Sequence, residues 1–180
     1  EWNAKKAVSP EQRISGHWWQ FVLNTDADAV VSLMMIDYSE LALKWKICGT
    51  SWTKDGTEIA KYWSRAAVLD PGDLNLFYYW KGNHPFDESI PEFFGVGEIQ
   101  FNDQGTGSIS AADRWFSNSP LKKLNDTIKK STTYVRATES DIEIVNKKSD
   151  IFALKDLISL RISEWRSKRS VTRDMHDSGY

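Results

Sequence analysis

The sequence predicts an all-β fold with a C-terminal helix, in which eight antiparallel strands close into an up-and-down β-barrel. Three observations lead to this fold class. Turn residues recur at short intervals along residues 1–110, as they do in a β-meander. Apolar runs of strand length lie between these turns, and we count eight candidate strands. Beyond residue 140 the apolar residues change to helical spacing.

The composition is typical of one globular domain spanning residues 1–180. Of its 180 residues, 41% are hydrophobic and 27% are charged. A net charge of −2 gives no general attraction to DNA or RNA. The single cysteine, Cys48, excludes an internal disulfide and favours a reducing compartment. Nine tryptophans either fill a small barrel or line a pocket that stacks on flat ligands, and the sequence leaves both readings open.

The first strand is expected at 16–23, and the rest of the chain is interpreted around it. Gly16-His17-Trp18 has the Gly-x-Trp form that opens the first strand of small ligand-binding barrels. Glycine lets the backbone bend where the strand enters the barrel, and Trp18, two residues on, shares its face and can close the barrel bottom. An ordinary half-buried strand is the alternative interpretation of so short a pattern.

The remaining strands follow in order, each bounded by turn residues. They are expected at 29–38, 41–52, 58–69, 74–81, 92–101, 106–112 and 132–138. The third has the clearest alternation, with Leu41, Leu43, Trp45 and Ile47 on one face. Residues 117–131 are basic and are expected to be irregular or to form a short helix. The barrel is therefore expected to span 16–138.

The C-terminal segment 140–169 is expected to be helical, with a flexible tail at 170–180. Ser140 and Glu143 fit a capping box, and a second helix start is expected at Ser149-Asp150. Apolar residues then recur at helical spacing: Ile151, Leu154, Leu157, Ile158 and Trp165. This face packs on the barrel or, alternatively, on a partner.

Chemistry that would identify an enzyme is missing from the sequence. Its histidines and its cysteine have no metal-ligand spacing, and it contains neither a Gly-x-Ser-x-Gly elbow nor a phosphate-binding glycine loop. We therefore expect no catalytic residues, no metal and no resident cofactor.

The candidate ligand-binding residues are aromatic side chains that stack on flat rings and arginines that pair with phosphates. They are Trp45, Trp63, Arg65, Tyr78, Trp80, Arg114, Tyr134 and Arg136. Each tryptophan has core filling as its alternative role, and each arginine has an ordinary surface position as its alternative.

The sequence resembles the two-transmembrane, β-strand-rich effectors of bacterial CBASS anti-phage systems. The resemblance rests on Gly16-His17-Trp18-Trp19, the 41–52 strand with its Lys54-Asp55-Gly56 turn, Tyr62-Trp63-Ser64 and Asp70-Pro71-Gly72-Asp73. It implies an eight-stranded barrel similar to lipocalins and avidin, on the cytoplasmic side of the inner membrane.

The same resemblance implies that the barrel senses a cyclic dinucleotide or related cyclic oligonucleotide, and that oligomerisation then disrupts the membrane through two N-terminal helices. This sequence contains no such helices and begins at Glu1 without methionine, so we expect it to be a fragment. A DNA or RNA partner is not expected.

Two other functions remain open. A lipocalin-like carrier of a small apolar ligand would keep Arg65 and Arg136 out of its pocket, whereas a nucleotide sensor would turn them inward. A filled interaction module would have no pocket and would present Trp165 on an exposed apolar stripe.

Overall fold

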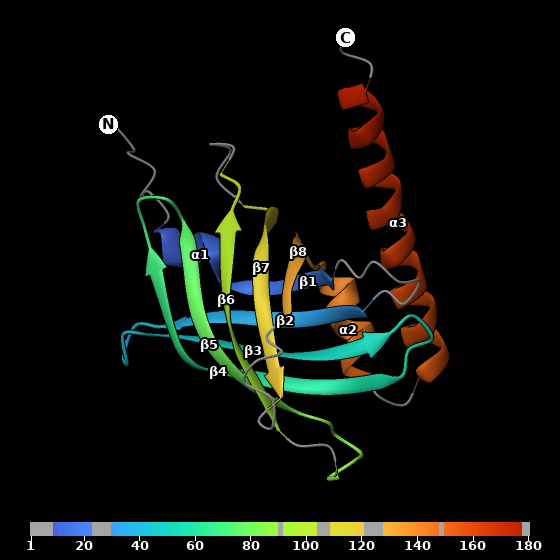
Figure 1. Cartoon of the computed structure of the whole chain (residues 1–180), viewed down its shortest axis with the longest axis horizontal. Coiled ribbons are helices and arrows are strands. Elements are labelled where there is room, and N and C mark those ends of the chain that lie inside the picture. The colour runs from blue at the N-terminus through green and yellow to red at the C-terminus, as the bar shows by residue number, and fades with distance from the viewer. Residues whose placement is uncertain are drawn as a thin grey trace, which may run out of the picture.

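The computed structural model describes residues 9–22, 30–89, 92–103, 109–120, 128–147 and 150–177, without the side chains of 118–120, 128–129 and 168–177. Eight strands form a closed barrel in chain order, which confirms the expected fold class (Figure 1). They are β1 (Gly16–Val22), β2 (Val30–Ser39), β3 (Lys44–Thr53), β4 (Glu58–Asp70), β5 (Asn75–Asn83), β6 (Phe93–Phe101), β7 (Ala111–Pro120) and β8 (Ile128–Arg136). Every neighbouring pair is antiparallel, and β1 pairs with β8 to close the barrel.

The barrel interior is packed with large side chains that alternate along the strands. Trp18, Met34, Ile36 and Leu76 are completely buried there. Glycines on the inner face make room for rings from neighbouring strands, since a Cβ at Gly49 would collide with the Tyr62 ring. Burial of these apolar surfaces is the main contribution to stability.

One end of the barrel, which we call the base, is closed by a short helix, α1 (Pro10–Ile14). Ser9 caps this helix and a proline occupies its first turn, as helix N-termini favour. Trp18 Nε1 donates a hydrogen bond to the Ile14 carbonyl at 3.0 Å, which fixes α1 against the first strand. The expected role of Trp18 in closing the barrel bottom agrees with this position.

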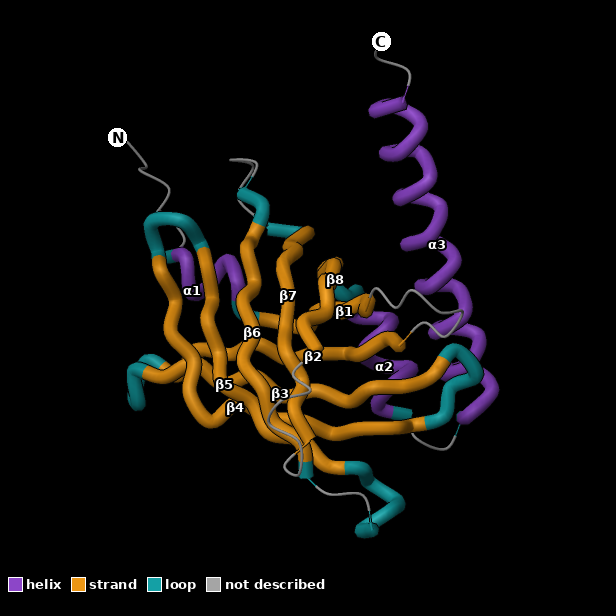
Figure 2. Tube along the Cα trace, viewed as in Figure 1, coloured by secondary structure: helices purple, strands orange, loops and turns teal. Residues whose placement is uncertain are grey.

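Two further helices, α2 (Glu139–Asn146) and α3 (Ile151–Asp177), lie outside the barrel. The N-terminal turns of α3 pack on its outer wall, and the C-terminal half extends beyond it (Figures 1 and 2). The contact buries apolar side chains from β1, β2, β3 and α3: Trp19, Phe21, Val31, Leu33, Trp52, Leu157, Ile158, Ile162 and Trp165. Helix α3 therefore packs on the barrel, which is one of the two roles expected for it.

A buried carboxylate joins both helices to the barrel. Asp141 accepts hydrogen bonds from Trp19 Nε1 at 2.9 Å and from Arg161 at 2.7 Å, and it also closes a capping box with Thr138. Burial opposes its ionisation, but the hydrogen bonds from Arg161, Trp19 and Thr138 outweigh this, so the pKa of Asp141 lies below its ordinary value. The capping box thus uses Thr138 and Asp141 rather than the expected Ser140 and Glu143.

Several expected boundaries are wrong. Leu41 and Leu43 lie in the β2–β3 turn and are exposed, because Leu43 has the left-handed φ of 47° that this turn requires. Strand β7 spans 111–120 and so runs well past residue 112, where the expected strand ended, while residues 106–108 of that expected strand lie outside the described residues. Strand β8 begins at 128, within the segment expected to be irregular. Helix α3 continues to Asp177, well past the start of the expected tail. Residues 24–28, between the first two expected strands, lie outside the described residues.

Candidate functional site

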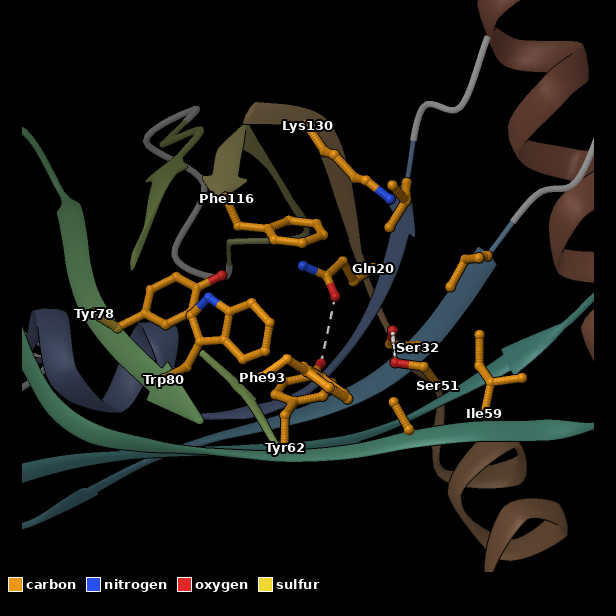
Figure 3. A pocket seen from close by; sticks show the side chains of 13 residues that line it. Gln20, Ser32, Ser51, Ile59, Tyr62, Tyr78, Trp80, Phe93, Phe116 and Lys130 are labelled. Carbon is orange, nitrogen blue, oxygen red and sulfur yellow. Dashed lines mark hydrogen bonds between the residues drawn. The ribbon is translucent and has the colours of Figure 1, made fainter. Parts of the chain in front are cut away.

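A cavity of about 220 Å³ lies inside the barrel, at the end opposite α1. It is bordered by the last residue of β1 and by residues within the first three positions of β2, β4, β6 and β8. Its walls are mostly aromatic and aliphatic, with one amide, two serine hydroxyls, two tyrosine hydroxyls and one amine (Figure 3). The lining residues are Gln20, Val22, Val30, Ser32, Ser51, Ile59, Ala60, Tyr62, Tyr78, Trp80, Phe93, Phe116 and Lys130.

Aromatic rings from four strands surround this space. Trp80 contacts Tyr62, Phe93 and Phe116 edge to face, with ring centroids about 6 Å apart (6.1, 5.8 and 5.9 Å). Such tilted contacts are the favourable arrangement for neighbouring rings and hold each in place. The cavity is therefore lined by rings that are tilted against one another and whose faces and edges can contact a planar ligand.

A chain of buried hydrogen bonds runs along the polar side of the cavity. Gln20 donates to the Tyr134 hydroxyl at 3.0 Å and accepts from the Tyr62 hydroxyl at 3.4 Å. Ser32 and Ser51 share a hydrogen bond of 2.8 Å between their hydroxyls. Figure 3 shows the Gln20–Tyr62 pair and the Ser32–Ser51 pair facing the same space. Since Gln20 is only 5% exposed, its amide is held in one orientation by its two tyrosine partners.

Burial keeps the tyrosines of this network neutral. It raises the pKa of Tyr62, Tyr78 and Tyr134, because an ionised phenolate would lose its hydration inside the barrel. All three therefore act as protonated phenols, which can donate a hydrogen bond.

Lys130 is the only cationic side chain among the described residues that line the cavity. It lies on the same face of β8 as Thr132 and Tyr134, and it is the third residue of the strand. Its side chain is partly exposed, so it lies at the solvent-facing rim of the cavity while Tyr134 lies deeper. Figure 3 shows its amine beside the space that the rings enclose.

Three of the eight predicted site residues belong to this site. Tyr78 and Trp80 line the cavity, and Tyr134 lies beneath it, bonded to Gln20. Trp45 also faces the barrel interior, but it does not line the cavity. It stacks at a tilt on Tyr38, 5.0 Å between ring centroids, near the base.

Three predicted residues lie on the outer surface instead. Arg65 is exposed at the irregularity between Ser64 and Ala66, and Trp63 lies on the face of β4 opposite to Tyr62. Arg114 has an unusual φ of 136°, and its side chain reaches Gln100 at 2.8 Å and Glu98 at 3.7 Å on the outside of the barrel. None of the three can contact a ligand held in the cavity.

Arg136 does face the interior, but it lies at the base. Its guanidinium donates to the main-chain carbonyls of Ser15 at 2.6 Å and Ile109 at 3.1 Å. It therefore closes the end of the barrel opposite to the cavity and takes no part in lining it.

The sequence interpretation missed the polar residues of the site. Gln20 shares the inner face of β1 with Trp18, so the period-two pattern places it inside, and a lone amide in an apolar strand is the signal. Ser32 and Ser51 interrupt apolar strands in the same way. Lys130 had no such signal, because its segment lacks an alternating pattern.

The described residues include no cluster of His, Cys, Asp or Glu that could hold a metal ion. Within the same part of the chain, no helix combines the length and apolar character needed to cross a bilayer. Comparison with protein-family models, curated proteins and solved structures returns no match.

Proposed function

We propose that this barrel binds a cyclic oligonucleotide in its internal cavity and is the sensing domain of an anti-phage effector of the CBASS type. The observation that supports the proposal is the cavity itself, which combines walls of aromatic rings with an oriented amide and a cation at its rim. Rings stack on a base, an amide pairs with its edge, and an amine attracts a phosphate. Ligand binding in this proposal leads to self-association and to disruption of the bacterial inner membrane by transmembrane helices that precede the barrel, which itself stays on the cytoplasmic side.

A carrier of a small apolar ligand is the second candidate. It is favoured by the placement of Arg65 and Arg136, neither of which lines the cavity. The filled interaction module is less favoured, because a cavity exists and Trp165 is only 8% exposed against the barrel.

The test is a thermal-shift and calorimetric screen of the purified chain against cyclic di- and trinucleotides, with retinol and a fatty acid as apolar ligands. The sensor proposal expects a selective response to one cyclic nucleotide at micromolar concentration or below. A response to retinol or the fatty acid alone would make this protein a carrier. No response to any compound would contradict both ligand-binding functions.

A further inference from the structure

The size of the cavity limits how much of a ligand can enter it. At about 220 Å³ it is smaller than the pockets of roughly 300–1,000 Å³ that enclose drug-sized molecules. A cyclic dinucleotide carries two bases and two phosphates, so the cavity can admit only a part of it. This inference rests on the proposed function and asks which part enters.

The interior offers partners for a base and none for a phosphate. The Gln20 amide has a second hydrogen on Nε2 and a second lone pair on Oε1 beyond those used by the two tyrosines. A donor beside an acceptor in one plane matches the edge of a nucleobase. By contrast, no cationic side chain among the described residues lies deep in the cavity, and a buried phosphate without a cation would be strongly unfavourable.

The rim offers the complementary group. Lys130 is partly exposed and, among the described residues, it forms no ion pair. An ammonium group there can meet a phosphate that remains in contact with water. The separation of an amide inside from an amine at the rim thus orients a nucleotide along the barrel.

We propose that one base of the cyclic nucleotide enters the barrel and pairs with the Gln20 amide between the aromatic walls, while its phosphates stay at the rim beside Lys130. Gln20 is then the residue that recognises the base, and Lys130 supplies the electrostatic attraction. The second base of a cyclic dinucleotide remains outside the cavity.

The experiment compares Gln20→Leu and Lys130→Met at low and high salt, using the cyclic dinucleotide that gives the strongest response among cyclic di-AMP, cyclic di-GMP and cyclic GMP-AMP. Gln20→Leu is expected to weaken binding about tenfold at both salt concentrations, because a lost hydrogen bond is hardly screened. Lys130→Met is expected to weaken binding at about 50 mM salt. Raising the salt to about 300 mM should then lower its affinity only slightly, whereas the same change should lower the affinity of wild type clearly. Trp45→Phe, inside the barrel but away from the cavity, is the control and should bind as wild type does.

A second measurement needs no substitution. Nuclear Overhauser contacts between the ligand and the rings of Phe93 and Phe116 are expected from base protons and not from ribose protons. Contacts from ribose alone, or unchanged affinity in folded Gln20→Leu together with an unchanged salt dependence in Lys130→Met, would overturn this orientation while leaving the sensor function intact. If wild type binds none of the cyclic nucleotides, the sensor function itself fails.

Discussion

The guanidinium of Arg136 lies over the ring of Trp18, with its central carbon 4.1 Å from the ring centroid. The last residue of β8 is thereby stacked on the third residue of β1, next to the carbonyls that end α1. Arginine suits this position because its planar fork stacks on a ring and donates to several carbonyls at once. This contact joins the first strand of the barrel to the last and closes the base of the barrel.

Replacing Arg136 should therefore destabilise the fold rather than remove a ligand contact. We expect Arg136→Lys to lower the free energy of unfolding by about 2 kcal/mol, because a lysine keeps the charge but cannot reach the same carbonyls. Urea denaturation measures this loss. Ligand affinity of the folded variant should be that of wild type, and a large loss of affinity without a loss of stability would contradict the position of Arg136 at the base.

The three buried tyrosines predict that stability falls at alkaline pH. Their folded pKa values lie above the ordinary tyrosine value of about 10, so the folded protein holds these protons more tightly than the unfolded chain does. The contribution is fully present below pH 10 and is lost as pH rises above it, by about 1.4 kcal/mol per pH unit for each phenol. Denaturation of Tyr78→Phe between pH 8 and 12 should show a shallower decline than wild type. The exposed Tyr79→Phe is the matched control and should reproduce the wild-type slope.

Gly95 should not tolerate a side chain. A Cβ there would collide with the main-chain carbonyl of Ser117 on the neighbouring strand β7, and backbone cannot move aside as a flexible side chain can. We expect Gly95→Ala to lower the free energy of unfolding by about 2 kcal/mol or more. Gly72→Ala serves as the control, because its Cβ would meet only a side-chain oxygen of Asp70 at 3.3 Å in an exposed turn. Equal stability of the two variants would show that β6 and β7 lie further apart.

Helix α3 should depend on Trp165 for its contact with the barrel. Its ring stacks on Phe21 with centroids 5.3 Å apart and planes inclined by 6°. Trp165→Ala is expected to cost about 3 kcal/mol and to speed hydrogen exchange in residues 157–165. Leu160, 52% exposed on the same helix, provides the control, and Leu160→Ala should change neither quantity. Slow exchange in Trp165→Ala would mean that the remaining apolar contacts suffice.

The sequence predicts the strands well where one face is apolar, because a half-buried strand must alternate. It fails where the local backbone geometry overrides the alternation or where the strand does not alternate. The alternation of apolar residues extends from Trp45 back to Leu43 and Leu41. The left-handed backbone at Leu43 nevertheless makes β3 begin only at Lys44, and a leucine does not indicate such a backbone in the sequence. Strand β7 lacks alternation in its sequence. It is defined instead by its pairing with β6 and β8, and it includes Arg114, whose φ is positive.

Alternation also gives the face of a residue but not its height along the barrel. Arg136, Tyr134 and Lys130 share one face of β8, yet the first seals the base, the second lies below the cavity and the third reaches its rim. Height is set by the register of each strand with its neighbours, which depends on residues far away in the chain. This is why the sequence predicted aromatic residues of the site correctly but also assigned to it three arginines that lie elsewhere.

Strand β1 faces two structures at once: Trp18 and Gln20 point into the barrel, and Trp19 and Phe21 hold α3 outside it. Adding or removing one residue within it would turn every later side chain to the opposite face. The cavity would lose its amide and the helix its docking surface in the same event. During evolution this stretch can therefore change by substitution, one face at a time, while insertions and deletions must fall in the turns.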